Sequence, residues 1–130
     1  MGGTILVVEA ERWMRELLQL HLSNAGYAVL AAEDAIAAGR MLLWQQPDLI
    51  LTDVQMPFMD GLEFIQAVKA DPRTASIPAI FLTCSAEVET QARQIGAADF
   101  LRKPVRADQL LAAVAKQVGE RVALATAKMA

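Results

Sequence analysis

Short runs of apolar residues recur along the chain and alternate with segments of helical periodicity. Four of these runs are apolar at consecutive positions, which is typical of parallel strands that helices cover on both faces. The strong runs are 5–8, 27–32, 49–52 and 80–83, and a weaker run is Phe100-Leu101. The pattern therefore predicts an α/β fold built around a parallel sheet.

The intervals between these runs carry helical patterns. In the first interval, apolar residues follow the i, i+3, i+4, i+7 spacing of an amphipathic helix, and Gly26 is placed to end it. Asp60 and Glu63 are spaced like a capping box that opens the third helix. The other helices are predicted over residues 36–44, 87–95 and from about 106 past 122. The predicted order is therefore βαβαβαβαβα.

Polar residues follow the predicted strands. Right-handed crossovers bring the carboxyl ends of parallel strands to one edge of the sheet, where open α/β sheets bind their ligands. A simple turn would explain Asp53 by itself. Two acids, a hydroxyl group and an ammonium group that meet at one edge indicate a functional site more specifically than Asp53 does alone. The residues expected at this edge are Glu9, Ala10, Asp53, Thr83 and Lys103.

Composition limits the class of protein. A chain of 130 residues suits one domain with a sizeable core, predicted over 1–125, with 126–130 as a tail or the start of a linker. No apolar run approaches the ~20 residues of a membrane helix, and no secretory signal is visible. The net charge of −3 predicts no direct contact with nucleic acid. One cysteine and one histidine exclude an internal disulfide and a His/Cys metal cage. We expect a cytoplasmic protein.

From residue 4 to about residue 120, the chain resembles the receiver domain of bacterial two-component response regulators. The matching segments occur in the order and spacing of the family. They are Ile5-Leu6-Val7-Val8-Glu9, Asp53-Val54-Gln55-Met56-Pro57-Phe58-Met59-Asp60-Gly61, Thr83, and Gly96-Ala97-Ala98-Asp99-Phe100-Leu101-Arg102-Lys103-Pro104. The resemblance implies a flavodoxin-like (βα)5 fold, doubly wound, with a parallel five-stranded sheet of order 2-1-3-4-5. Strands 1 and 3 would be neighbours, so that Glu9 and Asp53 share a pocket.

The resemblance also implies roles for the residues at this edge. Asp53 would accept a phosphoryl group from a sensor histidine kinase or a phosphotransfer protein, forming an aspartyl phosphate. Lys103 would pair with one phosphoryl oxygen, and the Thr83 hydroxyl would bind another. Phe100 matches the aromatic residue that moves with this hydroxyl. The chain would then be a signalling domain and not an enzyme, with at most slow self-dephosphorylation.

Residue 10 departs from the family, which usually has a second acid there. The resemblance implies that Glu9, Asp53 and the backbone carbonyl of Gln55 hold Mg²⁺, with waters completing its oxygen shell. Ala10 adds no side-chain oxygen, and loss of even an outer partner reduces metal affinity by ~10–100-fold. We expect a weak Mg²⁺ site and slow phosphorylation. Without an acid at position 10, Asp53 would experience less like-charge repulsion in the metal-free site. This reduction would partly offset the loss of the metal ligand.

The residues leave three functions open. In the first, phosphorylation shifts Thr83 and Phe100 and alters the helix 4–strand 5–helix 5 face, which binds a second copy or an effector domain. In the second, favoured by Ala10, a degenerate receiver binds partners without being phosphorylated. The third is a flavin or nucleotide enzyme, but no Gly-rich loop follows the first strand. Retention of Asp53, Thr83 and Lys103 places the phosphorylation switch first.

Four further residues have structural interpretations. Cys84 is interpreted as a small, buried apolar residue. His21 is expected to be packed or half-exposed on its helix. Trp13 and Trp44 are expected on helix surfaces or against the sheet. The Lys103-Pro104 bond matches a cis peptide of the family.

Overall fold

The computed structural model describes the backbone of residues 2–129 and the side chains of residues 2–119. Five parallel strands form one sheet in the order β2-β1-β3-β4-β5. This arrangement confirms the predicted fold class. The strands are β1 (Thr4–Val8), β2 (Ala28–Ala32), β3 (Leu49–Asp53), β4 (Ala79–Thr83) and β5 (Asp99–Arg102).

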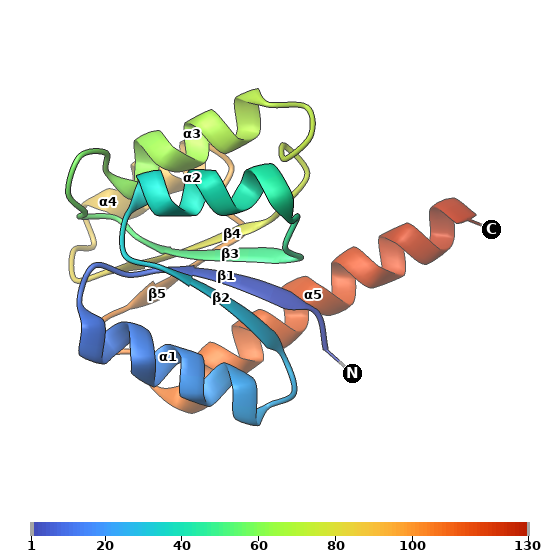
Figure 1. Cartoon of the computed structure of the whole chain (residues 1–130), viewed down its shortest axis with the longest axis horizontal. Helices are drawn as coiled ribbons and strands as arrows, with labels where there is room; N and C mark the ends of the chain where they lie inside the picture. Colours follow the sequence, from blue (N-terminus) through green and yellow to red (C-terminus); the bar gives the residue numbers. More distant parts are fainter. Residues whose placement is uncertain (1, 130) are drawn as a thin grey trace.

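Helices cover both faces of the sheet (Figure 1). One face carries α1 and α5, and the other carries α2, α3 and α4. The helices are α1 (Arg12–Asn24), α2 (Ala35–Trp44), α3 (Gly61–Ala70), α4 (Val88–Gln94) and α5 (Ala107–Met129). None of the helices that the structure describes combines the length and apolarity that a membrane crossing needs.

The core consists of two apolar layers, one on each face of the sheet. Successive side chains of a strand point to opposite faces. In β1, Leu6 packs with the α2–α3 layer, whereas Ile5 and Val7 pack with the α1–α5 layer. Every residue of β3 and β4 is buried. This two-sided burial explains why the strands appear in the sequence as continuous apolar runs.

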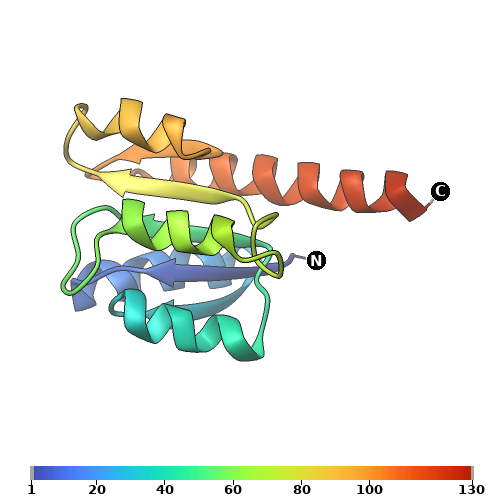
Figure 2. The ribbon, with the colours of Figure 1, turned by 90° about the horizontal axis from the view of Figure 1, so that it is seen from above.

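Helix boundaries follow local chemistry. The Asp60 side chain accepts a hydrogen bond from the backbone N–H of Glu63 at 2.8 Å, which confirms the predicted start of α3. Gly26 and Gly96 follow α1 and α4 with φ of 98° and 90°, values that favour glycine. In Figure 2, α5 runs on beyond the sheet, and it continues to Met129 without a break. The predicted boundary at 125 stays a prediction, and residue 130 lies outside the described residues.

Gly61 allows the chain after β3 to turn back onto the strand. A Cβ atom at this position would lie 1.9 Å from the backbone oxygen of Asp53, and the Gly61 N–H donates to the Val54 carbonyl at 2.6 Å. We expect Gly61→Ala to lower the free energy of unfolding by about 1–3 kcal/mol or more, because backbone must move.

Urea unfolding measures this effect, and Gly39→Ala is the matched control. A Cβ atom at Gly39, within α2, would meet nothing within 4 Å. The control should therefore gain about 0.5–1 kcal/mol from the better helix propensity of alanine. A Gly61→Ala variant as stable as the unmutated chain would contradict the close-approach explanation.

Candidate functional site

Three neighbouring strands place acids and a hydroxyl group at one edge of the sheet. Asp53 is the last residue of β3, with β1 on one side and β4 on the other. Glu9 follows β1, and Thr83 ends β4. The chain reverses its winding direction between β1 and β3, which is where doubly wound sheets bind ligands. The edge predicted from the sequence is therefore present.

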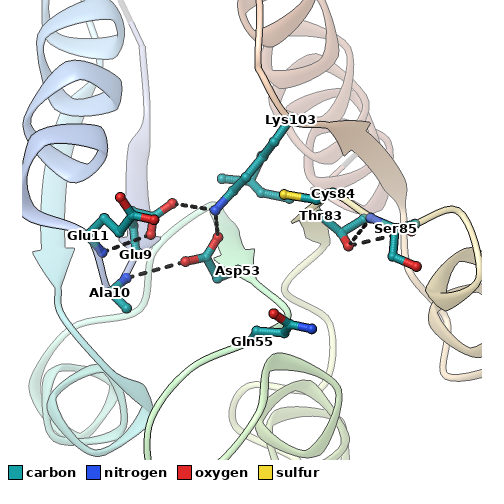
Figure 3. A pocket seen from close by; sticks show the side chains of 10 residues that line it. Glu9, Ala10, Glu11, Asp53, Gln55, Thr83, Cys84, Ser85 and Lys103 are labelled. Carbon is teal, nitrogen blue, oxygen red and sulfur yellow. Dashed lines mark hydrogen bonds and ion pairs between the residues drawn. The ribbon is translucent and has the colours of Figure 1, made fainter.

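Both acids are withdrawn from solvent. Glu9 is 0% and Asp53 is 3% exposed. Lys103 follows β5 and reaches across the edge, where its ammonium forms ion pairs with Glu9 Oε1 at 2.9 Å and with Asp53 Oδ1 (Figure 3). The Lys103 backbone N–H donates to the Thr83 carbonyl at 2.9 Å, which ties this residue to β4. The single ammonium of Lys103 thus forms ion pairs with two buried carboxylates.

Backbone donors complete the hydrogen bonding of the two carboxylates. The Ala10 N–H donates to Asp53 Oδ2 at 3.3 Å. The Glu11 N–H donates to Glu9 Oε2 at 3.0 Å. Each carboxylate therefore has the Lys103 ammonium on one oxygen and a peptide N–H of the β1–α1 turn on the other.

The two acids have opposite pKa shifts. Burial, and then the hydrogen bond with Glu9, raises the pKa of Asp53 to about 7 against the opposing effect of Lys103. For Glu9, burial acts upward but is outweighed by hydrogen bonds with Asp53 and Lys103, so its pKa is lowered. Burial depresses the Lys103 pKa, yet hydrogen bonds with both acids raise it. Like-charge repulsion on Asp53 therefore persists despite Ala10.

The site opens into a small cavity. Its volume is about 170 Å³. Residues from the carboxyl ends of β1, β3, β4 and β5 line it, and the predicted set is brought together there. They include Glu9, Ala10, Asp53, Gln55, Thr83, Cys84 and Lys103. The cavity is large enough for a phosphoryl-sized group with a few waters, given ≈ 30 Å³ per water in the liquid.

Of the two predicted switch residues, Thr83 lines this cavity, whereas Phe100 packs in the layer under α2–α4. The Thr83 hydroxyl accepts a hydrogen bond from the backbone N–H of Ser85 at 3.1 Å, so it faces the β4–α4 loop. Phe100 is half-buried, packs against the layer under α2–α4, and lies opposite Phe81 in the β4–β5 register. These positions are compatible with the predicted switch and do not test it.

The interpretation of Cys84 as buried is wrong. Cys84 is exposed, because β4 ends at Thr83 and the next residue lies on the loop at the cavity rim. His21 is half-buried on α1, as expected. Trp13 and Trp44 are surface residues, 64% and 89% exposed. The Lys103-Pro104 bond is cis, as predicted.

Sequence reasoning missed two features of the β1–α1 turn. The backbone N–H of Ala10 contacts the candidate acceptor Asp53, although residue type gives no sign of a backbone donor. The Arg15 guanidinium donates to the Glu9 carbonyl at 2.8 Å. The sequence does not distinguish this residue from Arg12, an equally basic residue at the start of α1 that pairs with Glu16 instead.

The donors at the cavity suit a hard cation in type but are few. Mg²⁺ takes oxygen ligands and often keeps several waters beside one or two carboxylates. Glu9 and Asp53 supply carboxylates, and Gln55 lines the same cavity. Among the described residues, however, no group of three acids, histidines or cysteines is arranged for a metal. The donor set therefore fits Mg²⁺ only as a site that relies on water.

A doubly wound α/β domain with an acid–ammonium pocket at its switch point is the class that fold and site define. The family model of the response regulator receiver domain matches residues 5–115. The chain belongs to this family, and the resemblance noted in the sequence is thereby confirmed.

Relatives and solved structures agree with this assignment. The chain is 37% identical over 114 residues to the phosphate regulon transcriptional regulatory protein PhoB of Pseudomonas aeruginosa, a match that covers 86% of this chain and 50% of that protein. It therefore spans about half the length of this curated relative. The receiver domain of a signal transduction histidine kinase from Syntrophus aciditrophicus is 32% identical, with a TM-score of 0.85 and 92% of each chain covered.

A second similar structure contains a metal ion. The receiver domain of a sensor histidine kinase from Pseudomonas aeruginosa PAO1 is 28% identical, with a TM-score of 0.84. The match covers 92% of this chain and 99% of that one, and that structure has a magnesium ion coordinated in its active site cleft.

Proposed function

We propose that Asp53 accepts a phosphoryl group from a sensor histidine kinase or a phosphotransfer protein. The observation that carries this proposal is the position of Asp53, buried at the end of β3 with one carboxylate oxygen on Lys103 and a cavity in front of it. A carboxylate nucleophile needs alignment and neutralisation of charge more than covalent assistance.

In the proposed transfer, the phosphoryl group passes from an imidazole nitrogen of the donor to a carboxylate oxygen of Asp53. An Asp53 carboxylate oxygen forms the new bond to phosphorus while the bond from phosphorus to the donor's imidazole nitrogen breaks. The imidazole leaves with the electron pair and takes a proton. Lys103, already within the site, stabilises negative charge on a phosphoryl oxygen. The product is an aspartyl phosphate, and the chain acts as a signalling domain with at most slow self-dephosphorylation.

Mg²⁺ would be held by Glu9, Asp53 and the backbone carbonyl of Gln55. When bound, the ion would supply positive charge for the phosphoryl oxygens. Because Ala10 contributes no side-chain oxygen, we propose weak Mg²⁺ binding and slow phosphorylation. The same absence favours the second candidate function, a receiver that binds its partners without phosphorylation.

Intact-protein mass tests the acceptor assignment. The chain is incubated with a small phosphodonor and Mg²⁺, beside Asp53→Asn. We expect a gain of one phosphoryl group in the unmutated chain and none in the variant. An adduct of the same size on Asp53→Asn would move the acceptor to another residue.

Thr83 is proposed to couple phosphorylation to the α4–β5–α5 face. Its hydroxyl now accepts from Ser85 N–H, in the loop that leads to α4. If the Thr83 hydroxyl turned toward a phosphoryl oxygen, it would release this loop and let Phe100 move. The altered face would then change its affinity for a second copy or an effector domain.

Thr83→Ala is therefore expected to keep the phosphoryl adduct but lose its structural effect. Amide hydrogen exchange in α4, with and without phosphodonor, measures this. The unmutated chain and Thr83→Ser should both change on phosphorylation, whereas Thr83→Ala should not. An equal change in all three proteins would exclude the hydroxyl as the coupling group.

Partners and location follow the same proposal. A kinase or phosphotransfer protein is the expected donor. A cytoplasmic location and the absence of direct contact with nucleic acid or membrane remain predictions for this chain.

A further inference from the structure

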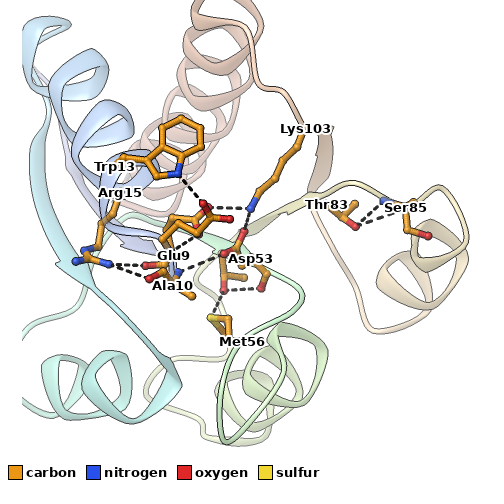
Figure 4. Close-up of polar contacts among 11 residues, drawn as sticks. Glu9, Ala10, Trp13, Arg15, Asp53, Met56, Thr83, Ser85 and Lys103 are labelled. Carbon is orange, nitrogen blue, oxygen red and sulfur yellow. Dashed lines mark hydrogen bonds and ion pairs between the residues drawn. The ribbon is translucent and has the colours of Figure 1, made fainter.

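Arg15 is half-buried in α1, yet its guanidinium makes no ion pair with any carboxylate of the described residues. It donates instead to two backbone carbonyls of the β1–α1 turn. Nη1 lies 2.8 Å from the Glu9 oxygen and 3.5 Å from the Ala10 oxygen (Figure 4). The strand β1 ends at Val8, so Arg15 supplies a donor to a carbonyl just beyond the strand.

The carbonyl that Arg15 binds belongs to the same peptide group as the N–H that contacts Asp53. That group is the Glu9–Ala10 peptide: its oxygen accepts from Arg15 at 2.8 Å, and its N–H donates to Asp53 Oδ2 at 3.3 Å. A peptide group is planar, so a fixed C=O direction also fixes the N–H direction. Hydrogen bonds in series polarise one another, and a cation on the oxygen makes the N–H a better donor.

We propose that Arg15 is a positioning residue for the phosphoacceptor, acting through the Glu9–Ala10 peptide. It holds that peptide so that its N–H fixes the Asp53 carboxylate, while Lys103 holds the other oxygen. In this chain the backbone N–H is what position 10 contributes to Asp53, since Ala10 has no polar side chain. The effect on phosphorylation rests on the proposed function, whereas the effect on the peptide does not.

The test compares Arg15→Met with Arg15→Lys and with Arg12→Met. Methionine keeps much of the aliphatic stem but loses the charge and the donors, and lysine restores one charged donor. Arg12 lies one turn earlier on α1, is exposed and pairs with Glu16. Arg12→Met therefore removes an equal charge from the same helix without touching the turn.

Two measurements are made on these variants after equal unfolding midpoints have been confirmed. The first is the amide proton resonance of Ala10, which should move upfield in Arg15→Met, partly return in Arg15→Lys and stay in place in Arg12→Met. The second is the rate of phosphorylation at saturating phosphodonor. It should fall about three- to tenfold in Arg15→Met, the effect of one lost hydrogen bond, with partial rescue by lysine.

An unchanged Ala10 resonance in Arg15→Met would overturn the proposal, as would an equal effect of Arg12→Met. If Arg15→Met is less stable than the unmutated chain, Arg15→Lys is compared with Arg15→Gln instead. These two variants also differ in charge at position 15, but both keep a polar side chain there. The amide measurement decides the role of Arg15 even if the unmutated chain accepts no phosphoryl group, a result that would overturn the proposed function alone.

Discussion

Asp53→Asn should stabilise the metal-free fold much more at pH 8 than at pH 5. The pKa of Asp53 is about 7 in the folded chain, against an ordinary value of 3.8. Between these pH values the folded state binds more protons than the unfolded state. The stability contributed by protonated Asp53 is therefore fully present below about 4 and is lost as the pH rises through about 7.

The physical reason is the burial of a second negative charge beside Glu9. At pH 5 the Asp53 carboxyl is neutral, and asparagine replaces it with a neutral group of similar shape. At pH 8 the carboxylate is ionised, whereas asparagine is not. A pH unit corresponds to about 1.4 kcal/mol, so the difference between the two conditions should be on the order of a few kcal/mol.

Urea unfolding at the two pH values, without Mg²⁺, measures this difference. Asp71→Asn is the matched control. The backbone and side-chain hydrogen bonds of Asp71 with Arg73 hold the pKa of Asp71 below its ordinary value. Removal of the Asp71 carboxylate should therefore destabilise the fold and not stabilise it. Equal effects of Asp53→Asn at pH 5 and pH 8 would contradict the raised pKa.

The second large effect is expected at residue 10. Ala10→Asp should tighten Mg²⁺ binding by about 10–100-fold, because it restores a carboxylate to a site whose existing acids share Lys103. The same change adds negative charge beside Asp53 and should destabilise the metal-free chain.

Titration calorimetry with Mg²⁺ measures the affinity, and Ala10→Asn is the control. Asparagine has nearly the shape of aspartate without its charge, so it should recover only part of the gain. Equal dissociation constants for the unmutated chain and Ala10→Asp would refute the missing-ligand explanation for weak Mg²⁺ binding.

Sequence patterns predicted the elements well because burial on two faces leaves a continuous apolar run. β3 and β4 are buried at every position and were evident from 49–52 and 80–83. β5 is only half-buried, which explains its weak signal at Phe100-Leu101. The sheet order, by contrast, came from the family resemblance, because right-handed crossovers alone do not determine which strands are neighbours.

The parts of the site that side chains form could be predicted from the sequence. The parts that the backbone forms could not. Asp53 and Lys103 could be placed together because Asp53 ends one strand of the sheet and Lys103 follows another. The Ala10 N–H and the direction of the Thr83 hydroxyl depend on turn geometry that residue types do not encode. Cys84 was misjudged because one residue of strand length decides whether a side chain is buried in the sheet or lies at its rim.

Phosphorylation of Asp53 is best tested as a function of Mg²⁺ concentration, with intact-protein mass as the readout. We expect one phosphoryl group on the unmutated chain at high Mg²⁺, and the same adduct on Ala10→Asp at about 10–100-fold lower Mg²⁺. An unmutated chain that takes no phosphoryl group at any Mg²⁺ concentration, beside an Ala10→Asp variant that does, would contradict this expectation. Such a chain would be a receiver that binds partners without phosphorylation.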